Sequence, residues 1–150
     1  MEITIDEWLI HYISDQEKAR VAYYFLEKVF KKCDRFVTLK NGKLDKKVFW
    51  LSKQSGEWEP KRRIVAKYFF NYFFMNSEKF FRMDESETPE MPENIARLTP
   101  EDDIYLIRTA LKTEEKLVLT SDVRLREKLS EISDIKILLV NEFLSDYKSD

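Results

Sequence analysis

The segment Lys116-Leu-Val-Leu-Thr120, followed by Ser121 and Asp122, decides the fold class of this chain. Its run of Leu and Val has the length of a strand and is flanked by charged residues, which is typical of a buried strand. A strand that is apolar on both faces belongs to a parallel sheet covered by helices. We therefore expect helices on either side of this segment and further strands of the same kind.

Helices are predicted immediately before and after this strand. Upstream, Thr99-Pro100-Glu101-Asp102 has the pattern of a helix start, with Thr as N-cap, Pro at the first position and an acidic residue at the third. Ile104–Lys112 continues that helix. Downstream, Val123–Ile132 is helical in its spacing, Lys136–Val140 is a second buried strand, and Glu142–Tyr147 closes the chain as a helix.

The N-terminal half shows the same alternation. Strands are predicted at Glu2–Asp6 and Arg35–Leu39. The predicted helices are Trp8–Ile13, Glu17–Lys32, Leu44–Ser52 and Lys61–Met83. Asp84–Asn94, which contains two prolines, is predicted to be a loop. This order predicts an α/β fold in one domain over residues 1–150, a three-layer sandwich with a central, mainly parallel β-sheet flanked by helices.

Composition excludes several classes of protein and of site. A length of 150 residues with 43% hydrophobic and 36% charged residues is typical of one globular domain, and no apolar run approaches the roughly 20 residues of a membrane span. The first residues lack the basic region of a signal peptide, so we expect the cytoplasm. The single Cys33 and the single His11 exclude a disulfide framework and a metal centre rich in Cys or His. Neither a GxGxxG nor a Walker A motif is present.

Charge is separated along the chain. Residues 27–67 carry thirteen Lys and Arg against five Asp and Glu, whereas residues 84–103 carry eight Asp and Glu against Arg97 alone. Such blocks arise from solvated faces, or from an anionic partner on one surface and cations bound at another.

Three aspartates are expected at one edge of the sheet. Asp6 ends the first strand, Asp122 lies two residues beyond Thr120, and Asp103 begins the helix that leads into that strand. Ligands of open parallel sheets bind outside the carboxyl ends of the strands. Carboxylates gathered there would repel one another without cations between them, and oxygen ligands suit Mg²⁺ or Mn²⁺. Asp34 and Asp134 precede their strands and are expected at the opposite edge.

These residues carry a resemblance to the PIN domain family. The specific part is Asp103-Ile-Tyr-Leu-Ile-Arg-Thr-Ala110 followed by Leu117-Val-Leu-Thr-Ser-Asp122 and Leu125. Ile137-Leu-Leu-Val-Asn-Glu-Phe143 is similar to the last strand of the family and the entry to its terminal helix, and Ile3-Thr-Ile-Asp6 to its first strand. The resemblance extends over residues 2 to 147.

The resemblance implies a metal-dependent endoribonuclease that hydrolyses RNA phosphodiester bonds with Mg²⁺ or Mn²⁺. Asp6, Asp103 and Asp122 match the first, third and fourth acidic residues of the family, which hold the metal and serve catalysis. Asp45 is the nearest position to the second. The hydroxyl groups of Thr120 and Ser121 are placed to orient Asp122 or a metal-bound water.

One position departs from the family pattern and keeps other functions open. The family usually has Asn or Ser two residues after its first aspartate, where this chain has Trp8. A second hypothesis is therefore a PIN-like module of weak or absent activity that binds RNA or a protein. A third is a structural or regulatory protein whose carboxylates are incidental.

Partner surfaces are predicted from basic and aromatic residues. Lys61, Arg62 and Arg63 are expected to contact RNA phosphates. The aromatic series from Tyr68 to Phe74 could stack bases, but packing in the core or in a dimer interface is favoured, and a homodimer is expected. The resemblance implies RNA as a partner and, for a toxin–antitoxin enzyme, an antitoxin or another protein; no membrane partner is expected.

Overall fold

Five parallel strands form the central sheet. In the computed structural model, which describes residues 1–147, the strand order is β3-β2-β1-β4-β5 and every neighbouring pair is parallel. The strands are β1 (Glu2–Ile5), β2 (Arg35–Leu39), β3 (Phe80–Met83), β4 (Leu117–Thr120) and β5 (Lys136–Leu139). Four of them confirm the predicted strands, and β3 adds an edge strand beside β2.

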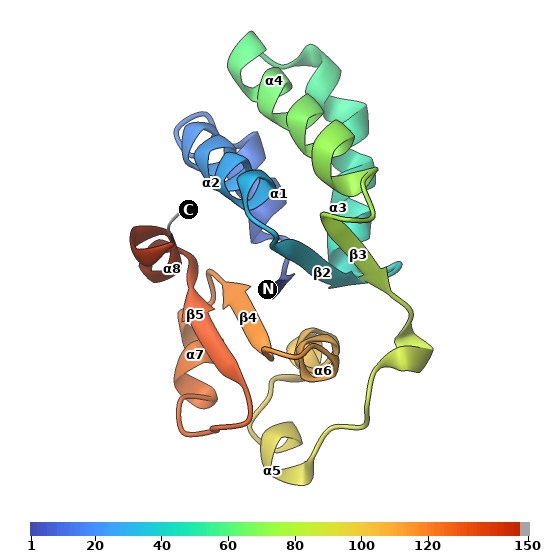
Figure 1. Ribbon diagram of the computed structural model, residues 1–150, viewed down its shortest axis with the longest axis vertical. Helices are drawn as coiled ribbons and strands as arrows, with labels where there is room; N and C mark the ends of the chain where they lie inside the picture. The colour runs from blue at the N-terminus through green and yellow to red at the C-terminus, as the bar shows by residue number, and fades with distance from the viewer. Residues whose placement is uncertain (148–150) are drawn as a thin grey trace.

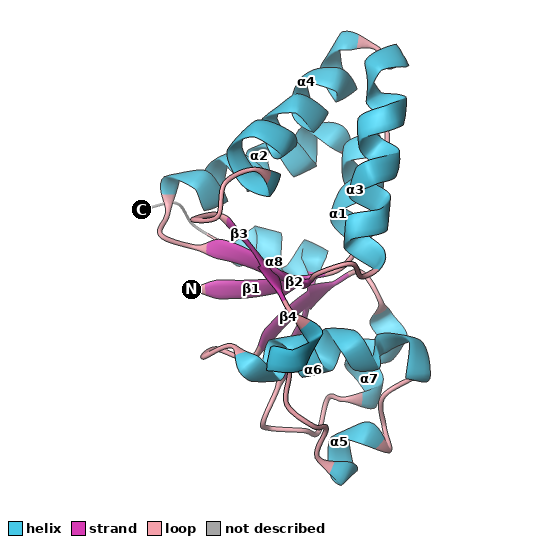
Figure 2. Ribbon diagram, turned by 90° about the vertical axis from the view of Figure 1, so that its right-hand side faces the viewer, coloured by secondary structure: helices cyan, strands magenta, loops and turns pink. Residues whose placement is uncertain are grey.

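Helices cover both faces of the sheet, which gives three layers (Figures 1 and 2). One face carries α1 (Trp8–Ser14), α2 (Ala19–Lys31), α3 (Lys43–Gln54), α4 (Pro60–Phe69) and α8 (Val140–Asp146). The other carries α5 (Glu93–Ala96), α6 (Ile104–Lys112) and α7 (Val123–Lys128). The predicted three-layer α/β sandwich is therefore confirmed. Within residues 1–147, no helix is long and apolar enough to cross a membrane.

Alternation along the strands divides the apolar core in two. Ile3, Ile5 and Leu119 join the larger cluster beneath α1, α2 and α4. Val118, the residue before Leu119, points to the other face and joins the cluster under α6 and α7 that contains Ile107. Side chains one residue apart on a strand point to opposite faces, so β1 and β4 are anchored from both sides.

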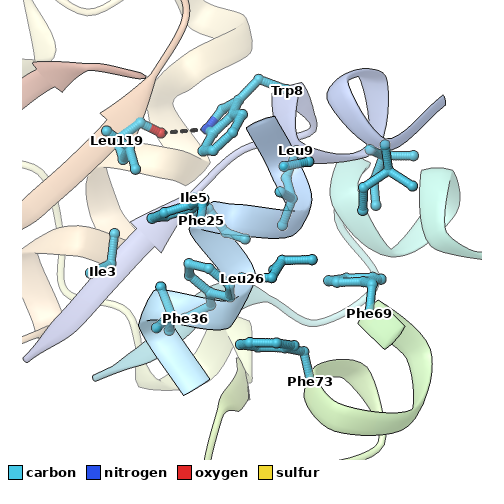
Figure 3. Close-up of a cluster of buried hydrophobic side chains, with 14 of the residues drawn as sticks. Ile3, Ile5, Trp8, Leu9, Phe25, Leu26, Phe36, Phe69, Phe73 and Leu119 are labelled. Carbon is cyan, nitrogen blue, oxygen red and sulfur yellow. Dashed lines mark hydrogen bonds between the residues drawn. The ribbon is translucent and has the colours of Figure 1, made fainter. Parts of the chain in front are cut away.

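Trp8 joins the segment after β1 to strand β4. Its indole Nε1 donates a buried hydrogen bond to the carbonyl oxygen of Leu119 at 2.8 Å (Figure 3). Its ring lies 5.3 Å from Tyr12 and 5.9 Å from Phe25, measured between ring centroids. Trp8 therefore braces the first strand and the fourth against each other.

The predicted helix Lys61–Met83 is wrong in its second half. Helix α4 ends at Phe69, a π-helical turn follows over Phe70–Phe74, and the chain then enters strand β3. The turn is closed by Asn76, whose backbone carbonyl accepts from the N–H groups of Lys79 and Phe80. This turn allows Phe80–Met83 to pair with β2, an outcome that the aromatic spacing alone did not indicate.

The aromatic series of this segment packs mainly in the core. Phe69 and Phe73 are fully buried, Tyr68, Phe70 and Phe74 are partly buried, and Tyr72 is exposed. The homodimer was expected on the premise that a single chain cannot bury so many aromatic rings. This premise is wrong, because the chain buries most of these rings itself. A homodimer stays a prediction without that support.

Two smaller expectations also need correction. Thr99 is not a helix N-cap, because its hydroxyl donates to the carbonyl of Ile95 at 2.7 Å and a 3-10 turn over Glu101–Asp103 leads into α6. Helix α7 ends at Lys128, several residues before the predicted end. The placement of Asp34 at the opposite edge is confirmed, since its carboxylate lies 2.9 Å from the N-terminal ammonium group of Met1.

We predict that Trp8→Phe lowers the free energy of unfolding by about 1–3 kcal/mol, because the buried carbonyl of Leu119 loses its donor. Urea denaturation followed by circular dichroism measures the change. Trp50→Phe, at an exposed tryptophan, is the matched control and should stay within about 0.5 kcal/mol of the wild type. Equal losses in the two variants would contradict a structural role for the indole bond.

Candidate functional site

The candidate site lies where the order of the strands reverses. From β1 the chain adds β2 and then β3 on one side, and later returns to add β4 and β5 on the other. In open parallel sheets such a switch point leaves a crevice outside the carboxyl ends of the two central strands, where ligands bind. Asp6 directly follows β1, and Asp122 lies two residues beyond β4. The topology therefore brings two of the predicted residues to the same edge.

Asp103 joins them from the N-terminal end of α6. Burial raises the pKa of the Asp103 carboxyl above its ordinary value, and the charges of Asp122 and Asp6 raise it further. Lys43 acts in the opposite direction. Asp6 and Asp122 thus lie close enough to Asp103 to act on its carboxyl electrostatically.

Asp6 is oriented by two donors that use the same oxygen. The N–H of Glu7 donates to Asp6 Oδ1 at 2.7 Å, and the hydroxyl of Tyr105 donates to it at 2.8 Å. Burial raises the pKa of Tyr105 far above its usual range, with the charge of Asp6 as the next cause. The phenol therefore keeps its proton, and Asp6 Oδ2 is the oxygen that an outside ligand would contact.

Asp122 is fixed as the N-cap of α7. Its Oδ1 accepts the backbone N–H of Leu125 at 3.1 Å. The hydroxyl of Thr120 accepts the N–H of Asp122 at 3.1 Å, so this hydroxyl orients the loop at the end of β4. Ser121 and Asp122 are exposed. Asp122 is therefore the most accessible carboxylate of the group.

Lys43 and Tyr105 belong to the site, although the sequence did not place either of them beside the aspartates. Lys43 Nζ donates to the backbone carbonyl of Asp102 at 3.1 Å and lies 5.4 Å from the centre of the Tyr105 ring. The ammonium group thus lies at the N-terminal end of α6, beside Asp103. The only sequence signal for Tyr105 is its position two residues after Asp103, and nothing in the sequence connects Lys43 to α6.

Asp45 is held in an internal ion pair. Its carboxylate is fully buried, accepts a forked pair of hydrogen bonds from the Arg82 guanidinium, and accepts the N–H of Asn41 at 2.7 Å. Arg82 lies on β3, the strand that the sequence analysis missed. A carboxylate with these partners is neutralised inside the fold, so the structure does not join Asp45 to the other three aspartates.

The predicted basic residues lie away from the acidic edge. Arg62 is ion-paired with Glu59 at 2.6 Å and donates to the carbonyl of Ser14 at 2.6 Å. Ser14 ends α1 whereas Asp6 precedes it, and a helix of seven residues is about 10 Å long. Lys61 and Arg63 are exposed near this far end of α1.

The oxygen donors of the site suit a hard cation, but the side chains do not form a closed set of metal ligands. Among residues 1–147, no three or more His, Cys, Asp or Glu side chains are grouped so that they could hold a metal ion. Mg²⁺ commonly uses one or two carboxylates and keeps several waters or substrate phosphate oxygens. Asp6, Asp103 and Asp122 supply oxygen donors and unneutralised charge, which suits such a cation in chemistry.

Comparison with solved structures finds a chain that is similar over most of its length. It is a chain in the crystal structure of VapBC2 from Rickettsia felis bound to a DNA fragment from their promoter, with a TM-score of 0.47 and 11% sequence identity. The alignment covers 93% of this chain and 98% of that chain. No family model matches the sequence, and no curated protein matches it. The function must therefore be inferred from the residues at this chain's own site.

We predict that Asp103→Asn stabilises the metal-free protein at neutral pH. The folded state raises the pKa of Asp103, so ionised Asp103 opposes folding, and its contribution is favourable only when the carboxyl is protonated. The advantage of the amide should therefore shrink as the pH falls through this raised pKa toward 3.8, the ordinary value of an aspartate. Thermal unfolding in a chelator measures it. Asp134→Asn, an exposed residue before β5, is the control, and a neutral-pH loss of stability in Asp103→Asn would contradict the prediction.

Proposed function

We propose that this chain is a PIN-like, metal-dependent endoribonuclease that acts through Asp6, Asp103 and Asp122. The convergence of the three carboxylates at the switch point of the sheet carries this proposal. Carboxylates that repel one another at a ligand-binding edge are costly for folding, and such sites are commonly functional. The sequence resemblance to the PIN domain agrees with this interpretation.

The proposed cation is Mg²⁺ or Mn²⁺, held by Asp6, Asp103 and Asp122. When bound, it would lower the pKa of water and offset the charge of a phosphate undergoing displacement. The chain's own residues have separate tasks. Tyr105 keeps Asp6 oriented through its hydrogen bond, and Thr120 positions the loop of Asp122. Asp103 is proposed as the proton acceptor, because burial and the charges of Asp122 and Asp6 raise its pKa.

Lys43 supplies positive charge at the same edge. Its ammonium group lies beside Tyr105 and the first residues leading into α6, where a scissile phosphate would approach the carboxylates. A lysine acts on phosphate as a point charge. Lys43 is therefore proposed to draw the RNA backbone toward a cluster that would otherwise repel it.

A second candidate is a PIN-like module that binds RNA or a protein and has little activity. A groove of about 450 Å³ between α2 and α4 favours a protein partner, because Tyr24 and Ile64 in its lining are exposed, Ile64 by 59%. An apolar surface of this kind suits an antitoxin or a second copy of the chain.

The nuclease proposal predicts that the protein cleaves end-labelled single-stranded RNA when Mn²⁺ is added. Asp122→Asn should lower the rate by at least about 100-fold, as expected when a group that handles protons or positions the reacting atoms is lost. Asp134→Asn, at the opposite edge of the sheet, should cleave like the wild type. RNA binding by the wild-type protein without any Mn²⁺-dependent cleavage would favour the second candidate.

Metal binding is predicted independently of cleavage. Isothermal titration with Mn²⁺ should detect binding to the wild type, and the double variant Asp103→Asn with Asp122→Asn should lose it, because two of the three oxygen donors no longer carry charge. Asp45→Asn is not a suitable control, since it would unbalance the buried Arg82. Asp134→Asn serves instead. Unchanged binding in the double variant would exclude these aspartates as the metal site.

A further inference from the structure

Helix α3 presents a basic and aromatic stripe of which the proposed function uses only the first residue, Lys43. Lys43, Lys47 and Trp50 are spaced four and three residues apart, so they share one flank of the helix. Trp50 is 44% exposed, and its ring lies 6.1 Å from that of Trp58. Lys47 Nζ lies 5.9 Å from the centre of the Trp50 ring, and the Arg62 guanidinium lies 4.7 Å from that of Trp58.

This stripe begins at the candidate site. Its first member, Lys43, contacts the backbone of Asp102 and the ring of Tyr105. The opposite flank of α3 carries Asp45, which is paired with Arg82 on β3. The stripe therefore faces away from β3, and its first residue contacts the start of α6. A rise of 1.5 Å per residue places Trp50 about 10 Å along the helix from Lys43, and Figure 2 shows α3 rising from the sheet on the same side as α1.

The charge of this surface suits a polyanion. Helix α3 contains Lys43, Lys46, Lys47 and Lys53, and its single acidic residue is the buried Asp45. Glu59, at the start of α4, is ion-paired with Arg62. The exposed face of α3 is therefore cationic as well as aromatic.

An exposed indole between cations is a platform for unpaired bases. Every base has a π-face that stacks on an aromatic ring, while flanking Lys and Arg contact the phosphates. A duplex buries these faces between its own base pairs and offers mainly its backbone and grooves. The arrangement of Lys47, Trp50 and Trp58 therefore fits a single strand better than a duplex.

We propose that Lys43, Lys47, Trp50 and Trp58 form a track for single-stranded RNA that leads to the acidic cluster. Trp50 stacks a base about two helical turns from Lys43, with the partly buried Trp58 beside it, and Lys43 and Lys47 contact the intervening backbone. The choice of RNA rests on the proposed function. We therefore place the main RNA contact on this track and not at Lys61, Arg62 and Arg63, because Arg62 is already bound to Glu59 and Ser14.

Binding is measured separately from cleavage, with the full chain and a fluorescein-labelled 12-nucleotide oligouridylate in excess chelator. Fluorescence anisotropy should give a Kd that rises about 5- to 100-fold in Trp50→Ala, the range expected for the loss of one base stack. Trp50→Phe should restore most of the affinity. Phe49→Ala removes a neighbouring ring of α3 that is 55% exposed on a different part of the helix surface, and should bind like the wild type.

The lysine contacts give a second readout. Lys47→Ala should reduce the slope of log Kd against log salt by about 0.7, the value for one phosphate contact on a single strand. Circular dichroism confirms that the variants fold, as expected for exposed positions. The track would be overturned if Trp50→Ala bound the oligouridylate with wild-type affinity. It would also be overturned if the protein bound a duplex of the same length as tightly as the single strand and Trp50→Ala weakened both equally.

The two proposals fail in different ways. Binding that depends on Trp50, without cleavage under any divalent cation, would overturn the nuclease proposal and leave the track. Cleavage that depends on Asp122, with binding indifferent to Trp50, would overturn the track and leave the nuclease. A wild-type protein that binds no single-stranded RNA would overturn the track as well, and the exposed tryptophans would then fit a protein partner.

Discussion

Mutual repulsion among Asp6, Asp103 and Asp122 is the constraint on which the rest of this structure depends. Burial raises the pKa of Asp103 and the charges of Asp122 and Asp6 raise it further, so ionised Asp103 opposes folding. The elements that carry these residues must be held by interactions elsewhere. β1 and β4 are packed from both faces, and the buried bond from Trp8 to the carbonyl of Leu119 joins them directly. The core thus keeps together charges that would separate if the strands were free to move.

Much of the fold could be predicted because its strands are short apolar runs between charged residues. β4 and β5 are clear examples, and the two aspartates that follow β1 and β4 could be placed at one edge from the direction of parallel strands alone. β3 could not be predicted in the same way. Phe80–Met83 continues an aromatic segment without Gly or Pro, and the change from helix to strand depends on a turn at Asn76. The absence of a break in the segment suggested a continuous helix, whereas pairing with β2 decided the outcome.

The candidate site was less predictable wherever partners come from distant segments. Asp45 has the spacing of a fourth acidic residue, but its charge is balanced by Arg82, which is 37 residues away on the strand that sequence analysis missed. Tyr105 and Lys43 enter the site only because α6 and α3 meet there. The basic triplet at residues 61–63 was prominent in sequence, yet the fold uses Arg62 to join α4 to the end of α1. Local patterns located the acids, and tertiary contacts determined which charges surround them.

The ion pair that removes Asp45 from the acidic cluster also orients α3. Because Asp45 is paired with Arg82 on β3, the flank of α3 about half a turn away is directed away from β3. That flank carries Lys43, which reaches α6, and then Lys47 and Trp50. One buried pair therefore has two consequences: it leaves three aspartates at the site, and it aligns a cationic, aromatic helix surface with them. A substitution at Arg82 would disturb the direction of α3 and the positive charge beside Asp103 together, although Arg82 lies on an edge strand outside the cluster.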